Sequence, residues 1–171
     1  MMKTETFWKL IAQSIEEKDT LDKNDQGDRL MEILTPLDTK TVVGFHKRMV
    51  ELRKALDFPM MRDIAFMMGY KENPTAYEGF RNWVISLGEA HYKKAKKSPA
   101  HLLTLKDPNL FVVGRPYFPD LNFVSSGAFY TKTDKGILDW EGELEKFNTR
   151  QPVRSTSRSD SRIEKGKDID R

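Results

Sequence analysis

The segment from Tyr77 to Lys97 constrains the fold of this chain more than any other stretch. Its apolar and aromatic positions recur every three or four residues, as on one face of an α-helix. They are Tyr77, Phe80, Trp83, Val84, Leu87 and His91. Four lysines close the segment, where the dipole of a helix favours positive charge. We therefore predict one long helix here, with Trp83 in the middle of its buried face, as the central element of the fold.

Helical patterns also cover most of the chain before and after this segment. We predict helices over Glu5–Lys18 with Thr4 as the N-cap, Asp28–Leu34, Pro36–Leu56 with Thr35 as the N-cap, Met60–Gly69 and Pro99–Leu105. The Met60–Gly69 helix is apolar on most sides, so we expect it to be buried. Gly44 lies inside a predicted helix, where glycine is unfavourable, so we expect another segment to pack closely against it.

The pattern changes after Asp107. Leu110–Val113, Asn122–Val124 and Ala128–Thr131 have the short β-branched or aromatic composition typical of strands, and a last helix is predicted over Ile137–Phe147. We predict a mainly α fold, a compact bundle of about five to six helices, with a small β-containing C-terminal addition and a disordered tail. The predicted boundaries are 1–107 for the helical domain, 108–148 for the addition and 149–171 for the tail.

Composition favours a soluble protein with a hydrophobic core. The chain has 171 residues, of which 38% are hydrophobic and 32% charged, and it contains no cysteine, which excludes disulfides and thiolate metal sites. No apolar run approaches the length of a membrane span, and the N-terminus shows no signal-peptide pattern, so we expect a cytoplasmic location. The net charge of +3 comes from residues 150–171, since residues 1–149 carry equal numbers of acidic and basic side chains.

Several short motifs together resemble those of a bacterial family known as domain of unknown function 4240. They are Phe7-Trp8 near the start, Thr35-Pro36, Gly69 after an apolar helix, and the run Phe80–Ile85 leading to Gly88 and Tyr92. The resemblance covers roughly Thr4 to Asp107. It implies a mostly helical fold, and it implies no established activity.

Two groups of residues are candidates for a functional site. Arg81, His91 and Tyr92 lie in the most family-like part of the chain and could form a small-ligand or enzymatic site, although each has an ordinary structural role as an alternative. Arg115, Tyr117 and Phe118 belong to a proline-stiffened aromatic loop, which is typical of a protein-binding surface. The alternative for Phe118 is that it packs on the helices.

Motifs for metal, nucleotide and covalent chemistry are absent from the sequence. The acidic stretch from Asp22 to Asp28 begins like a calcium loop, but Ile33 stands where the bidentate glutamate should be. We therefore expect no cofactor and no metal, and our leading hypothesis is a non-catalytic protein-binding module. A toxin-neutralising immunity protein is one concrete form of it. Weak nucleic-acid binding through the basic tail stays as another alternative.

Overall fold

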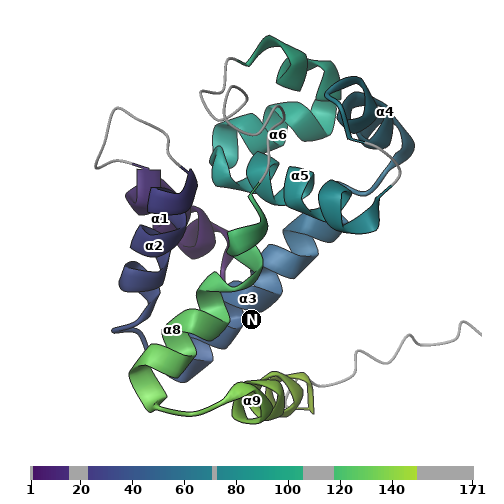
Figure 1. Ribbon diagram of the computed structural model, residues 1–171. Coiled ribbons are helices and arrows are strands. Elements are labelled where there is room, and N and C mark those ends of the chain that lie inside the picture. The colour runs from purple at the N-terminus through teal and green to yellow at the C-terminus, as the bar shows by residue number, and fades with distance from the viewer. Residues whose placement is uncertain (1, 16–22, 71–72, 106–117, 150–171) are drawn as a thin grey trace, which may run out of the picture.

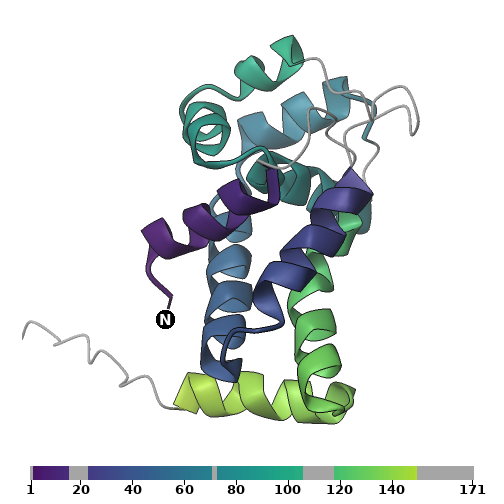
Figure 2. The same ribbon diagram turned by 90° about the vertical axis from the view of Figure 1, so that its left-hand side faces the viewer.

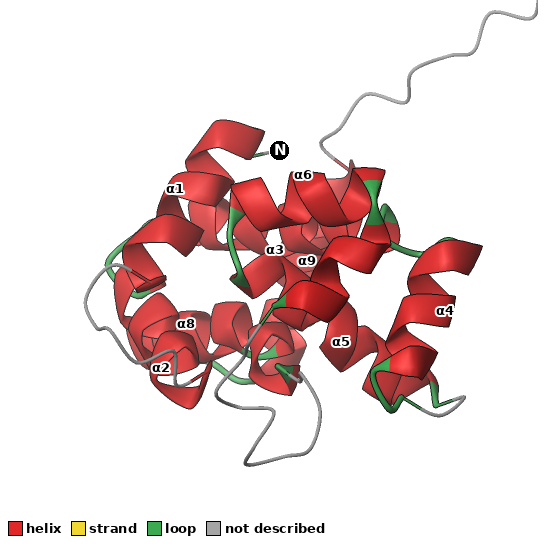
Figure 3. Cartoon of the chain, turned by 90° about the horizontal axis from the view of Figure 1, so that it is seen from above, coloured by secondary structure: helices red, strands yellow, loops and turns green. Residues whose placement is uncertain are grey.

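The structure is a computed structural model, and it describes residues 2–15, 23–70, 73–105 and 118–149. All the regular elements in these ranges are helices, as Figure 3 shows. The α-helices are α1 (Thr4–Ile15), α2 (Lys23–Leu34), α3 (Thr39–Lys54), α4 (Pro59–Met67), α5 (Pro74–Ser86), α6 (Glu89–Lys97), α8 (Val124–Thr133) and α9 (Ile137–Thr149). Two short 3-10 helices, η1 (Pro99–Thr104) and η2 (Pro119–Asn122), complete them. The predicted mainly helical fold is confirmed.

Helix α3 is the axis around which the other helices are arranged (Figure 1). Helix α8 lies along it, α2 packs on α8 and α1 crosses near them, while α4, α5 and α6 gather at one end and α9 crosses the other end (Figures 1 and 2). The core between them is aromatic. Phe7 of α1 stacks on Phe45 of α3 with ring centroids 4.7 Å apart, and Phe80 stacks on Trp83 of α5 at 5.8 Å. All four side chains are fully buried.

The predicted long helix from Tyr77 to Lys97 is wrong in one respect, because it is two helices. Helix α5 ends at Ser86, and Gly88 precedes α6 with a φ of 91°. Only glycine adopts this conformation at little cost, so the chain turns there and α6 leaves in a new direction. Trp83 is buried in the middle of α5, as predicted. His91 and the lysines belong to α6, so they do not continue the buried face of α5.

The predicted strands are also wrong where the structure describes them. Ala128–Thr131 lies inside helix α8, and Asn122–Val124 joins η2 to α8. The buried positions of α8, Val124, Ser125, Ala128 and Phe129, have helical spacing, and α8 packs against α2 and α3. Packing on these helices therefore overrides the local preference of β-branched and aromatic residues. The predicted helix over Ile137–Phe147 is confirmed as α9, whereas Leu110–Val113 and the tail lie outside the described residues.

The start of α3 differs from the predicted one because Asp38, not Thr35, caps it. The Asp38 carboxylate accepts hydrogen bonds from the backbone N–H and the hydroxyl of Thr41, at 3.0 and 2.6 Å. These bonds hold the pKa of Asp38 below its ordinary value. Thr35 instead donates to the carbonyl of Met31 and completes the end of α2. The close approach expected at Gly44 is confirmed, since a Cβ built there would lie 3.3 Å from Cβ of Met2.

Candidate functional site

Helix α4 presents large apolar side chains to solvent. Met61, Ile64 and Ala65 are buried, but Met60, Phe66 and Met67 are between 59% and 67% exposed. The expectation that this helix is buried on most sides is therefore wrong. Helix α4 packs against α5 and η1, and the apolar residues on its other faces stay largely exposed.

Local sequence fixes both ends of α4 and the start of α5. Pro59 occupies the first turn of α4, where its missing N–H costs nothing. Gly69, with a φ of 90°, ends the helix and lets the N–H of Tyr70 donate to the carbonyl of Ala65 at 3.0 Å. The Asn73 side chain then accepts hydrogen bonds from the backbone of Thr75 and Ala76 and starts α5. Helices α4 and α5 then contact each other.

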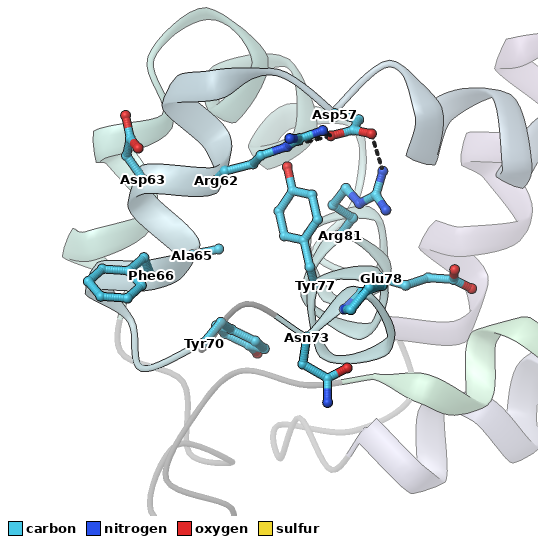
Figure 4. Close-up of a pocket in the computed structure, with 11 residues that line it drawn as sticks. Asp57, Arg62, Asp63, Ala65, Phe66, Tyr70, Asn73, Tyr77, Glu78 and Arg81 are labelled. Atoms are coloured by element: carbon cyan, nitrogen blue, oxygen red, sulfur yellow. Dashed lines mark hydrogen bonds and ion pairs between the residues drawn. The ribbon is translucent and has the colours of Figure 1, made fainter.

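A cavity of about 600 Å³ lies between α4 and α5. Its walls combine aromatic rings with charged groups, as Figure 4 shows. The lining residues that matter here are Asp57, Arg62, Phe66, Tyr70, Tyr77 and Arg81. A concave site with aromatic walls and a few polar groups is the usual form of a ligand site in proteins.

The charged wall is organised around Asp57 and Tyr77. Arg62 donates twice to Oδ1 of Asp57, from Nε at 3.0 Å and from Nη2 at 2.7 Å. The Tyr77 ring lies between two guanidinium groups, 4.4 Å from that of Arg81 and 6.0 Å from that of Arg62 (Figure 4). The Tyr77 hydroxyl donates to the carbonyl of Leu56 at 3.3 Å, and burial raises the pKa of this tyrosine.

Arg81 is the least well paired of these charges. Its side chain is only 12% exposed, and its distance to Asp57 is 3.6 Å. Nη1 also donates to the carbonyl of Arg53 at a long 3.4 Å, and Nε is buried with no hydrogen-bond partner among the described residues. The neighbouring Arg53 is near enough that the positive charge of Arg81 contributes to lowering the pKa of Arg53, after burial as the main cause. A buried cation of this kind is energetically costly.

The three predicted residues Arg81, His91 and Tyr92 make different contacts. Tyr92 is buried, its hydroxyl donates to the carbonyl of Leu52 at 3.0 Å, and burial raises its pKa to about 12. His91 lies beside His101 with their rings stacked and Nδ1 3.1 Å from Nε2. Of the three, Arg81 alone lines the cavity.

The predicted aromatic loop is described only at its end. Phe118 is buried in the core, and its backbone N–H donates to the carbonyl of Gly79 at 3.2 Å. Its side chain is therefore a core contact and is not exposed to a partner. Arg115 and Tyr117 lie outside the described residues, so their role as binding residues stays a prediction.

Sequence reasoning missed most of the cavity wall. Asp57 precedes α4, Arg62 lies on it, and Tyr77 was predicted only as part of a buried helix face. Asp57 and Arg62 are five residues apart, but the α4 side and the α5 side of the wall are separated by a connection whose geometry the sequence does not show. The sequence held one indication of this site, because the charged residues Arg62 and Asp63 interrupt the otherwise apolar segment that forms α4. No cluster of three or more metal-ligating side chains occurs among the described residues, and no helix described here is both long and apolar enough to cross a membrane.

Comparison with known proteins identifies one family. A family model described as "Protein of unknown function (DUF4240)" matches residues 2–131. The match continues past Asp107 and includes α8, which the resemblance seen in the sequence had left out. Neither the curated proteins nor the solved structures contain a match to this chain.

Proposed function

This chain belongs to the DUF4240 family of proteins of unknown function, and we propose that it is a non-catalytic module that binds another protein through helix α4. The exposed apolar side chains of α4 are the observation that carries the proposal. Exposed apolar groups gathered beside a cavity are typical of interaction sites in soluble proteins. Methionine and aromatic residues are also enriched at the centres of protein interfaces.

The geometry of α4 suits a partner that lies along the helix. Met60 and Met67 are seven residues apart, which is two helical turns, so they lie on the same face. Phe66 lies a quarter turn away at the edge of the cavity. A partner can therefore cover the methionines and place a side chain in the cavity at the same time. A few such anchors supply most of the binding energy in known interfaces.

The enzymatic alternative has less support, since of Arg81, His91 and Tyr92 only Arg81 lines the cavity. A general acid or base must lie within hydrogen-bond reach of the group it serves. The Tyr92 hydroxyl already donates to a backbone carbonyl, and burial holds its pKa near 12. A toxin bound by this chain as an immunity protein would be one partner of the proposed kind.

The test compares two exposed apolar surfaces at opposite ends of the molecule (Figure 1). One variant carries Met60→Gln and Met67→Gln on α4. The matched control carries Leu138→Gln on α9, where the leucine is 79% exposed. Each tagged full-length protein is purified from its native host, co-purifying proteins are identified, and binding is then measured with the purified partner.

We expect the partner to be lost by the α4 variant and kept by the control, with both variants melting like the parent protein. The same partner binding equally well to both variants would overturn the assignment to α4. The absence of any stoichiometric protein partner, together with a cellular phenotype abolished by His91→Ala, would overturn the binding function itself.

A further inference from the structure

The arginines beside the cavity outnumber the carboxylates that pair with them. Arg53 forms an ion pair with Glu78 at 2.7 Å, and Arg62 forms one with Asp57 at 2.7 Å. Arg81 has only the second oxygen of the same Asp57, at 3.6 Å. Asp63 also lines the cavity, but Figure 4 shows its carboxylate pointing away from the arginines. Within the described part of the chain, one buried guanidinium therefore lacks a carboxylate of its own.

The guanidinium group of Arg81 carries a positive charge and five N–H donors. The face of the Tyr77 ring, 4.4 Å away, stabilises part of the charge. The hydrogen-bonding capacity remains underused, since Nε has no partner and both contacts of Nη1 are long. A planar guanidinium with free donors matches a carboxylate, which can accept two parallel hydrogen bonds.

We propose that the cavity receives the side-chain carboxylate of an aspartate or glutamate of the partner protein, and that Arg81 binds it. This inference rests on the proposed function, and it adds the chemistry that the partner must supply. A carboxylate carries a single negative charge and accepts hydrogen bonds from a guanidinium group. A dianionic phosphate fits less well, because the carboxylates of Asp57, Asp63 and Glu78 line the same cavity and repel a dianion more strongly than a monoanion.

The surroundings also indicate what flanks the acidic residue. Phe66, Tyr70 and Tyr77 form the aromatic part of the wall, so an apolar neighbour of the acidic residue can be buried there. Met60 and Met67 do not line the cavity themselves, whereas Phe66, next to Met67 on α4, does. The apolar neighbours of the acidic residue can therefore contact Phe66 first and the methionines beyond it.

The test begins with random peptides displayed with both ends blocked, so that no terminal carboxylate is presented. These peptides are selected on the full-length protein. We expect the enriched sequences to share one aspartate or glutamate between apolar residues. A selected peptide is then synthesised with capped ends, together with its Glu→Gln or Asp→Asn form. Affinities are measured for the parent protein and for Arg81→Met, Arg81→Lys and Leu138→Gln.

We expect neutralising the peptide or changing Arg81 to Met to weaken binding by at least about tenfold, the usual effect of losing a charge-assisted hydrogen bond. Combining the two changes should weaken the affinity for the peptide little more than either change alone. Arg81→Lys should recover only part of the affinity, and Leu138→Gln should change nothing.

The possible failures point to different conclusions. Peptides that require Met60 and Met67 but bind equally well without their acidic residue would overturn the carboxylate site and leave the protein-binding function standing. Free C-terminal peptides that bind better than capped ones would overturn the assignment to a side chain. If no peptide is enriched and no protein partner is found in the native host, both the proposed function and this inference fail.

Discussion

Arg53 and Arg81 are two arginines with similar burial and very different surroundings. Arg53 belongs to α3 and is 15% exposed, while Arg81 belongs to α5 and is 12% exposed. Arg53 donates to Glu78 at 2.7 Å, to the side chain of Asn122 and, at 3.4 Å, to the side chain of Asn82. Arg81 has two long contacts and one unpartnered nitrogen.

The difference separates a structural charge from one available for binding. The partners of Arg53 come from α5 and η2, so this arginine connects three elements that are distant in sequence. Its hydrogen bonds offset the cost of burying the charge. Arg81 faces a cavity and lacks such compensation, although it lies one residue from Asn82 on the same helix. Burial by itself therefore does not show which charged groups are structural. The number of short hydrogen bonds and ion pairs that each group makes distinguishes them.

A third buried base, His46, shows why Arg81 is exceptional. Nδ1 of His46 is buried without a hydrogen-bond partner among the described residues, and its ring lies nearly perpendicular to that of Trp140 of α9, with ring centroids 5.5 Å apart. Burial, with smaller effects from Arg53 and Lys47, lowers the pKa of His46 to about 4. His46 therefore avoids the cost of a buried charge by losing its proton at neutral pH, which Arg81 cannot do.

The largest effect is expected from removing the support that the two arginines share. Trp83 is fully buried on α5, which carries Arg81 itself and the partners Glu78 and Asn82 of Arg53. Trp83→Ala should lower the free energy of unfolding by roughly 3–5 kcal/mol, through lost burial and a cavity in the core. Urea denaturation measures it, with Phe123→Ala as the control because Phe123 is exposed. Equal effects of the two substitutions would show that α5 is not the central support.

The next largest effect is the loss of stability at acidic pH that His46 causes. Because the folded-state pKa of about 4 lies below the ordinary value of 6.5, the unfolded chain binds a proton that the folded chain excludes. The contribution of His46 is thus fully present above pH 6.5 and is lost as the pH falls toward 4. Between pH 7 and pH 4.5 this amounts to roughly 2–3 kcal/mol.

The variant His46→Gln isolates this contribution from those of other titrating groups. We expect the stability difference between the parent and His46→Gln to change by that amount between pH 7 and pH 4.5, in favour of the variant at low pH. NMR titration of His46 gives its pKa directly. A pKa near 6.5 would show that the contact with Trp140 leaves His46 accessible to water.

Removing the Arg53 side chain should lower the free energy of unfolding by a smaller amount. Glu78 loses its ion-pair partner, but it is partly exposed, so water can solvate its carboxylate instead. Arg53→Met leaves the amide groups of Asn82 and Asn122 with fewer partners, although they keep their mutual hydrogen bond of 3.0 Å. We expect a loss of roughly 1–3 kcal/mol in the free energy of unfolding, measured by urea denaturation at pH 7. A loss below about 0.5 kcal/mol would mean that the contacts of Arg53 are energetically unimportant.

The contrast between the two arginines could not be predicted from sequence. Helical periodicity correctly identified most helices and the buried Trp83, because the apolar face of a helix is visible in local spacing. It did not show the break at Gly88, since a glycine within a periodic pattern is compatible with a continuous helix. It also predicted strands in α8, where contacts with α2 and α3 decide the outcome.

The candidate site was predicted only at Arg81. The sequence did not indicate that α4 exposes Met60 and Met67, because apolar residues on most sides of a helix are typical of a buried one. Nor did it place Tyr77 between two guanidinium groups, since the contact of Tyr77 with Arg62 depends on how α4 and α5 meet. A contact between two helices follows from tertiary structure and leaves no regular spacing in the chain.

The smallest effect on stability is expected at the residue proposed to matter most for binding. Arg81→Met removes a buried cation whose desolvation is poorly compensated, and it replaces the side chain with an apolar one of similar length. The lost attraction to the Tyr77 ring and to Asp57 acts in the opposite direction. We therefore expect the free energy of unfolding to change by no more than about 1 kcal/mol, in either direction, by urea denaturation at pH 7. The comparison with Arg53→Met under the same conditions is the decisive one. If Arg81→Met destabilises the protein more than Arg53→Met does, then Arg81 is a structural residue, and the cavity beside it offers no unpaired charge to a partner.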